Sequence, residues 1–132
     1  MTQAETPTQT PFDVIGGHDA IRRVVNRFYD LMDSDPDYAQ LRAMHAPDLT
    51  PMRESLAGWL AAWAGGPRDW FVANPGKCVM SAHAALGVTA ETARQWTDAM
   101  TRAIDEGGLD DADLGRLIAE RFTLMANAMV AD

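Results

Sequence analysis

Residues 65–89 read GGPRDWFVANPGKCVMSAHAALGVT, and this stretch decides between the folds that are open to the chain. Its opening Gly-Gly-Pro predicts an abrupt end to the preceding helix, because glycine readily leaves helical geometry and proline cannot continue a helix. From Arg68 to Gly76 we expect a loop or a single helical turn, with the side chains of Trp70 and Phe71 packed inward. A segment with little regular helix and many large apolar residues needs a surface to pack on.

Amphipathic helices are predicted on both sides of this stretch. Their apolar residues recur at i, i+3 or i+4, and i+7, which places them on one helical face. The predicted helices run from His18 or Asp19 to Met32, from Tyr38 to Met44, from Leu49 to Trp63 after an Asp48 or Thr50 cap, from Ala90 to Glu106 after a Thr89 cap, and from Asp110 to Met129. A short apolar turn, Phe12–Ile15, precedes them, and no segment has the alternating pattern of a strand. The stripe of the last helix comprises Leu114, Leu117/Ile118, Phe122, Met125 and Met129.

Two all-α architectures fit these helices. A simple four-helix bundle would use the histidines and tryptophans as packing residues. The residues between Gly65 and Thr89 are a poor component of such a bundle, because they contain little regular helix. A flat, apolar prosthetic group between the Leu49–Trp63 helix and the segment around His83 would give them a partner.

Composition limits the size and the partners of the protein. With 132 residues and 14.4 kDa, the chain is expected to form one domain with a single sizeable core. A net charge of −8 argues against nucleic acid and against an anionic membrane surface as partners. No apolar run is long enough to span a bilayer. We expect residues 1–11 to be a flexible tail and residues 12–132 to be the folded domain.

The location of the protein is predicted from the same sequence. Residues 1–11 have neither a basic start nor an apolar middle, so they do not resemble a secretory signal or a transit peptide. The chain contains one cysteine, Cys78, which allows no internal disulfide and fits a reducing compartment. We therefore expect a cytoplasmic protein.

His83 is the most informative single residue. The chain has three histidines, His18, His45 and His83, and the last lies in the apolar segment Met80–Val88. A buried imidazole must satisfy two ring nitrogens, and an iron ion is one way to occupy one of them. A core histidine with ordinary hydrogen bonds is the alternative.

Several short strings, taken together, carry a family resemblance. They are Phe12–Gly17, Arg27–Met32, Leu41–Leu49, Trp63–Pro67, His83 and Trp96. In this order and spacing they resemble the group II truncated haemoglobins, from about Phe12 to Met129. The resemblance implies a globin-like two-over-two helical sandwich that contains haem b, with His83 as the iron ligand.

The same resemblance implies a distal face built from Tyr29, His45 and Trp96. Dioxygen on iron acquires partial negative charge, which phenol, imidazole and indole donors in a dry pocket stabilise. Slow ligand release would follow. Each residue has an alternative role: Tyr29 could reach solvent, Trp96 could be pure core, and His45 could be an exposed helix-end residue, while His18 is expected on the surface.

The complete set expected to contact haem includes apolar residues from several helices. It consists of Phe28, Tyr29, His45, Met52, Leu56, Trp59, Trp96 and Met100, together with the metal ligand His83. Met52 stands where the family commonly has a small residue, so we expect it to fill space, although a thioether can also bind iron.

A second departure concerns the haem propionates. The positions at which relatives carry basic residues read Ser55, Met80 and Ala82 here. Exposed charge-assisted contacts of this kind contribute about 1 kcal/mol or less each. Haem would therefore be held mainly by His83 and apolar burial, with Arg53, Arg68 and Lys77 as candidate substitutes. Cys78 could lie near the haem edge or be an inert thiol.

The predicted function is binding of O2, CO and NO at ferrous iron. A redox activity toward peroxide or toward reactive nitrogen or sulfur species is a further expectation from the family. The sequence shows no flavin or nicotinamide motif, so an electron donor would be a separate partner. A monomer or a homodimer fits the surface pattern. The alternative function is a haem-free interaction or sensor module on a globin scaffold.

Overall fold

The structure, a computed structural model, describes residues 10–74, 87–107 and 109–130. Within these ranges all regular secondary structure is helical, and there is no strand. The elements are α1 (Pro11–Ile15), α2 (Gly17–Ser34), η2 (Pro36–Tyr38), α3 (Ala39–Ala43), α4 (Thr50–Trp63), α5 (Asp69–Ala73), α7 (Ala90–Glu106) and α8 (Ala112–Ala128). No helix in this part of the chain is long and apolar enough to cross a membrane.

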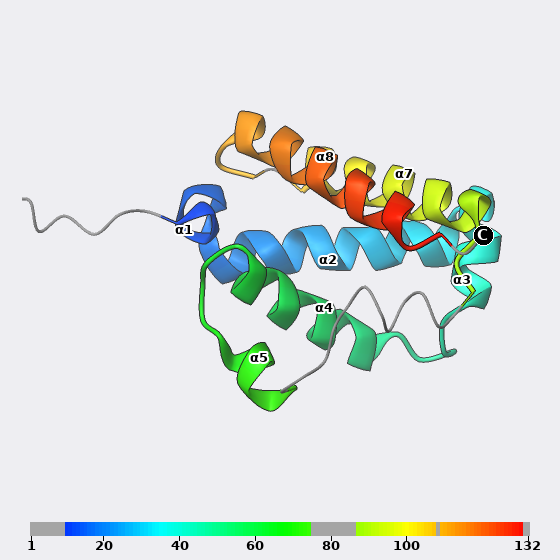
Figure 1. Cartoon of the computed structure of the whole chain (residues 1–132), viewed down its shortest axis with the longest axis horizontal. Coiled ribbons are helices and arrows are strands. Elements are labelled where there is room, and N and C mark those ends of the chain that lie inside the picture. The colour runs from blue at the N-terminus through cyan, green and yellow to red at the C-terminus, as the bar shows by residue number, and fades with distance from the viewer. Residues whose placement is uncertain (1–9, 75–86, 108, 131–132) are drawn as a thin grey trace, which may run out of the picture.

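The long helices pack as two pairs. Helix α2 contacts both α4 and α7, and α7 contacts α8. Figure 1 shows α7 and α8 as an antiparallel pair on one side of α2, with α4 on the other side. The predicted all-α architecture of stacked helix pairs is thus present in the described residues.

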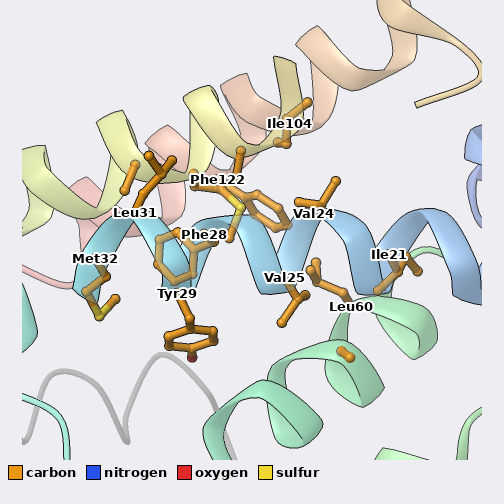
Figure 2. Close-up of a cluster of buried hydrophobic side chains, with 14 of the residues drawn as sticks. Ile21, Val24, Val25, Phe28, Tyr29, Leu31, Met32, Leu60, Ile104 and Phe122 are labelled. Atoms are coloured by element: carbon orange, nitrogen blue, oxygen red, sulfur yellow. The ribbon is translucent and has the colours of Figure 1, made fainter. Parts of the chain in front are cut away.

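Helix α2 supplies the centre of the core. Its apolar residues repeat with helical spacing, so one face is buried while the arginines remain outside. The side chains of Phe28, Val25 and Met32 are each at most 1% exposed, and they share one core cluster with Phe122 of α8 and Leu60 of α4; Figure 2 shows Phe28 beside Phe122 and Val25 beside Leu60. The sequence pattern of this helix predicted the same face.

A tight contact holds α1 against the end of α4. The amide of Phe12 donates a hydrogen bond to the carbonyl oxygen of Ala64, 2.9 Å away. Gly65 has φ of +96°, a left-handed conformation that favours glycine. A Cβ on Gly66 would lie 2.6 Å from Cδ1 of Phe12, so only glycine permits this approach. The Gly-Gly-Pro sequence therefore ends α4 and allows α1 to pack against that end.

Side-chain caps fix the starts of α7 and α8. The predicted Asp48 or Thr50 cap of α4 is wrong, because the N-cap is Leu49, without a side-chain cap, and Asp48 accepts a hydrogen bond from the Thr50 amide at 3.0 Å just before the helix. Thr89 forms a capping box with Thr92 at the start of α7, as predicted. The predicted start of the last helix at Asp110 is wrong, because α8 begins at Ala112 after the cap Asp111, which accepts from the Leu114 amide at 3.0 Å. The Asp110 amide instead donates to the carbonyl oxygen of Ile15.

Two further expectations about packing are corrected. Leu117, predicted on the buried stripe of α8, is 47% exposed, whereas the adjacent Ile118 is 7% exposed. Trp70 and Phe71, predicted to pack inward, are half-buried on the short helix α5. Consecutive residues of an α-helix point about 100° apart, so Leu117 faces solvent while Ile118 faces the core.

Candidate functional site

A cavity of about 260 Å³ lies between the two helix pairs. It is bounded by α2, α3, α4 and α5 on one side and by α7 and α8 on the other. The described lining residues are Tyr29, Leu41, Met44, His45, Ala46, Met52, Ser55, Leu56, Trp59, Trp70, Val88, Thr92, Ala93, Trp96, Phe122, Met125, Ala126 and Met129. Ligand pockets commonly span roughly 300–1,000 Å³, so this cavity approaches the size of a small-molecule site.

The described lining carries no aspartate, glutamate, lysine or arginine. Most of it is apolar, and aromatic and methionine side chains contribute much of the surface. The polar groups are the hydroxyls of Tyr29, Ser55 and Thr92, the imidazole of His45, and the tryptophan indoles. A site of this composition suits a large, flat, apolar ligand that requires only a few directed polar contacts.

Tyr29 projects from α2 toward this cavity. Its side chain is 3% exposed, so the alternative in which it reaches solvent is wrong. Figure 2 shows its hydroxyl directed away from α7 and α8. Burial raises the pKa of the hydroxyl from 10.0 to about 12, and the charge of Arg53 opposes part of that rise. The phenol therefore keeps its proton at neutral pH and can donate a hydrogen bond.

His45 follows the C-terminal end of α3 and is half-buried. Its Nδ1 lies 2.9 Å from the carbonyl oxygen of Leu41. Its ring meets that of Tyr29 edge to face, with centroids 6.0 Å apart. The structure thus brings these two predicted residues to one wall, and His45 is a cavity residue at a helix end.

Trp96 of α7 belongs to both the core and the cavity wall. Its ring meets Phe28 at a centroid distance of 5.5 Å and Phe122 at 5.8 Å, each edge to face. It also lines the cavity with Tyr29 and His45. The three residues predicted for the distal face therefore share one cavity.

The remaining predicted contacts divide into two groups. Met52, Leu56 and Trp59, all on α4, line the cavity, and Met52 is 38% exposed. Phe28 and Met100 are fully buried behind the wall and do not line it. Their direct contact with haem remains a prediction that this cavity does not support.

Several predictions concern residues that the structure does not describe. His83, the predicted metal ligand, lies outside the described ranges. The same is true of Lys77, Cys78, Met80 and Ala82. Their roles remain predictions from the sequence.

Sequence reasoning missed the contribution of α8. Phe122, Met125 and Met129 were predicted only as core residues of a buried stripe, yet they line the cavity. Met44 and Met52 also line the cavity, so together with Met125 and Met129 four methionines contribute to its wall. The available signal was the extension of the apolar stripe of α8 to the end of the chain, but such a stripe looks the same whether it packs on protein or on a ligand.

Two of the candidate cations, Arg53 and Arg68, lie in the part of the chain that the structure describes, and both have partners within the protein. Arg53 donates to Oδ1 of Asp30 at 2.8 Å and to the carbonyl and side-chain oxygens of Asn26, both at 3.1 Å. The guanidinium carbon of Arg68 lies 5.1 Å from the ring centroid of Phe71. Neither arginine lines the cavity. Arg53 therefore joins α4 to α2 in this structure.

The residues present fit a haem group. Its macrocycle is flat and apolar, which matches an uncharged cavity walled by aromatic and methionine side chains between two helix layers. Tyr29 and Trp96, whose side chains each carry a hydrogen-bond donor, both line the cavity, which suits a haem protein that holds a polar ligand. The negative propionates would find no cation among the described lining residues and would be best placed toward solvent.

Comparison with known proteins supplies independent information. The family model described as bacterial-like globin matches residues 10–131. No curated protein sequence matches the chain. Among solved structures, the group II 2-on-2 haemoglobin from Agrobacterium tumefaciens is 27% identical, with a TM-score of 0.89 over 96% of this chain and 98% of that one.

Two further structures give similar agreement. The cold-adapted truncated haemoglobin from Pseudoalteromonas haloplanktis is 25% identical, with a TM-score of 0.88 over 94% of this chain and 99% of that one. The thermostable haemoglobin from Thermobifida fusca is 28% identical, with a TM-score of 0.82 over 93% and 98% of the two chains. Each of the three comparisons covers nearly the whole of this chain and of the matched chain.

Proposed function

Because this chain belongs to the bacterial-like globin family, we propose that it binds haem b in the cavity between its two helix pairs and binds dioxygen and other diatomic gases there. Membership of the family implies a haem-binding globin. The structural matches confirm the predicted resemblance to group II truncated haemoglobins and the two-over-two helical sandwich. The kind of haem and the gases bound are the further steps of the proposal.

One observation carries the proposal. Tyr29, His45 and Trp96, which come from three different parts of the chain, meet at one uncharged cavity. An apolar cavity with a few polar side chains gathered on its wall is typical of a small-molecule site, so their convergence supports a bound ligand. This pattern favours a ligand-binding haemoprotein over the haem-free interaction module.

The bound haem would supply a ferrous iron able to take up a small gas, with His83 as its ligand from the protein. The Tyr29 hydroxyl, protonated at neutral pH, and the Trp96 indole N–H would donate hydrogen bonds to a ligand that carries partial negative charge. Leu56 and Trp59 would exclude water from it. The apolar wall and the donors together favour slow release of dioxygen.

Activity toward peroxide or toward nitrogen or sulfur species is a finer part of the same proposal. It rests on the polar groups at the cavity, and it requires a separate electron donor. We place the protein in the cytoplasm, as a monomer or a homodimer, because its one cysteine and its acidic composition suit that setting.

The test is the ultraviolet–visible spectrum of protein expressed with excess haem precursor. We expect a sharp Soret band that shifts when the reduced protein binds carbon monoxide. In His83→Ala this band should be lost or strongly altered. His18→Ala is the matched control, because His18 is an exposed histidine on α2 whose ring meets only the edge of Phe12 among the ring contacts of the described residues.

Two results would overturn the proposal. A folded wild-type chain without any Soret band would leave the haem-free interaction module as the function. An unchanged spectrum in His83→Ala would assign the iron ligand to another residue. Equal changes in His83→Ala and His18→Ala would point to a general loss of folding, which circular dichroism would show.

A further inference from the structure

Two exposed leucines lie on one face of α8. Among the described residues, the exposed large apolar side chains are those of Met52, Val72, Leu117 and Leu124. Met52 lines the cavity, and Val72 lies on the short helix α5. Leu117 and Leu124 are 47% and 66% exposed, and both belong to α8, which lies in front of α7 in Figure 1. An α-helix turns about 100° per residue, so side chains seven residues apart point within about 20° of each other. Leu117 and Leu124 therefore form one apolar stripe, the α8 stripe.

Two opposite charges flank the α8 stripe. Glu120 and Arg121 are exposed and lie between the two leucines along the helix. The same rotation places Glu120 about 50° to one side of the middle of the stripe and Arg121 about 50° to the other side. In the part of the chain that the structure describes, neither side chain has a hydrogen bond or an ion pair. Asp113 and Arg116 of the same helix, in contrast, pair with each other.

This helix is neutral, although the chain is acidic. The net charge of −8 makes two copies of the protein repel each other where their acidic surfaces meet. Helix α8 contains two carboxylates, Asp113 and Glu120, and two guanidinium groups, Arg116 and Arg121. The α8 stripe is therefore a surface on which a second copy can approach without a net like-charge contact.

The charges also select the direction of the pair. In a two-fold symmetric dimer, the α8 stripe of one copy packs on the same stripe of the other. If the two helices ran antiparallel, each flank would face its own counterpart, with Arg121 against Arg121 and Glu120 against Glu120. In a parallel pair, the Arg121 flank faces the Glu120 flank. These residues are consecutive, so the opposite charges lie only about 1.5 Å apart along the helix axis.

We propose that α8 is the interface of a parallel, two-fold symmetric homodimer, in which Leu117 and Leu124 pack on their counterparts and Arg121 of each copy pairs with Glu120 of the other. Interfaces below about 1,200 Å² are typical of weak complexes, and a single helix pair is a small interface. We therefore expect a reversible dimer with a Kd in the micromolar range. None of these four residues lines the cavity, so the inference does not rest on haem binding.

The first experiment is analytical ultracentrifugation of the full chain under reducing conditions, from about 1 µM to about 1 mM. We expect the mass to rise with concentration from 14.4 kDa toward twice that value. Leu124→Glu should weaken association about tenfold or more, because it opposes two carboxylates in an apolar layer. Val72→Glu makes the same change at a residue that is 78% exposed on α5, and as the matched control it should leave association unchanged.

The second experiment tests the charge pairs. Arg121→Glu and Glu120→Arg each create like-charge contacts across the parallel pair, so each variant should be more monomeric than wild type. An equimolar mixture of the two should recover association, because every contact between the two different chains again joins opposite charges. The double variant Glu120→Arg/Arg121→Glu should associate like wild type for the same reason.

The third experiment tests the parallel direction by cross-linking in a Cys78→Ser background. In a parallel pair Leu124 lies against its own counterpart, whereas in an antiparallel pair it would lie against Leu117. Mild oxidation should therefore link Leu124→Cys to itself in a covalent dimer. Val72→Cys, as the control, should remain monomeric under the same conditions.

Several results would overturn the inference. A wild-type chain that stays monomeric at about 1 mM would refute it, and so would a dimer that Leu124→Glu does not weaken. A mixture of Arg121→Glu and Glu120→Arg that fails to associate would refute the charge pairs, and absence of the Leu124→Cys cross-link would refute the parallel direction. Should circular dichroism show that Leu124→Glu is unfolded, Arg121→Glu tests the same face. Absence of a Soret band would refute haem binding and leave these measurements intact.

Discussion

High pH should destabilise this protein mainly through one hydroxyl, that of Tyr29. Its pKa is about 12 in the folded protein and near 10.0 when exposed. A folded-state pKa above the unfolded value means that the folded protein binds the proton more tightly. This stabilisation is therefore complete below pH 10 and is lost as the pH rises toward 12. In the same range the phenol ceases to be a hydrogen-bond donor.

The size of the effect follows from the shift in pKa. One pKa unit corresponds to 1.36 kcal/mol, so a shift of about two units gives about 2–3 kcal/mol between pH 10 and pH 12. Solvent screening reduces this little, because the Tyr29 side chain is 3% exposed. The cause is desolvation of a phenolate in an uncharged cavity, which the nearby Arg53 charge only partly offsets.

The assay is urea unfolding of the haem-free protein at pH 8, 10, 11 and 12, followed by circular dichroism, for wild type and Tyr29→Phe. We expect wild type to lose about 2–3 kcal/mol more than Tyr29→Phe between pH 10 and pH 12. Contributions from Tyr38 and from surface groups cancel, because both proteins contain them. An equal loss in the two proteins would show that the phenol is hydrated in the folded state, and the reasoning would fail.

Two further substitutions test the packing around the cavity. Gly66→Ala should destabilise by about 1–3 kcal/mol in urea unfolding, because its Cβ would lie 2.6 Å from Phe12, whereas Gly58→Ala, with its nearest contact at 3.4 Å, should be neutral or stabilising. Phe122→Ala should cost about 3–5 kcal/mol, because Phe122 is 2% exposed, and Leu124→Ala, 66% exposed on the same helix, should change stability by less than about 0.5 kcal/mol. If Gly66→Ala lost no more stability than Gly58→Ala, or Phe122→Ala no more than Leu124→Ala, the packing described here would be contradicted.

Helix positions were predictable from the sequence because they depend on local properties. Apolar spacing located α2 and its buried face, and the capping chemistry of Thr89 located the start of α7. Errors occurred where neighbouring residues compete. Asp110 and Asp111 are both good caps, and the bond from the Asp110 amide to Ile15 leaves Asp111 as the cap of α8. That contact is tertiary and has no local signal.

The site was predicted less completely, for a different physical reason. Periodicity marks a buried face and does not specify whether protein or ligand covers it, so Met125 and Met129 looked like core residues. The family resemblance supplied Tyr29, His45 and Trp96 as a set. It did not supply the contact between Nδ1 of His45 and the carbonyl oxygen of Leu41, which depends on the geometry of α3.

The placement of α7 links these observations. Gln95 and Trp96 are consecutive, so helical geometry directs their side chains about 100° apart, and one reaches α3 while the other reaches the cavity. The hydrogen bond from the Leu41 amide to Gln95 therefore ties α3, which His45 follows, to the turn of α7 that carries Trp96. Gln95, which is 4% exposed and does not line the cavity, thus joins two of the elements that form its wall.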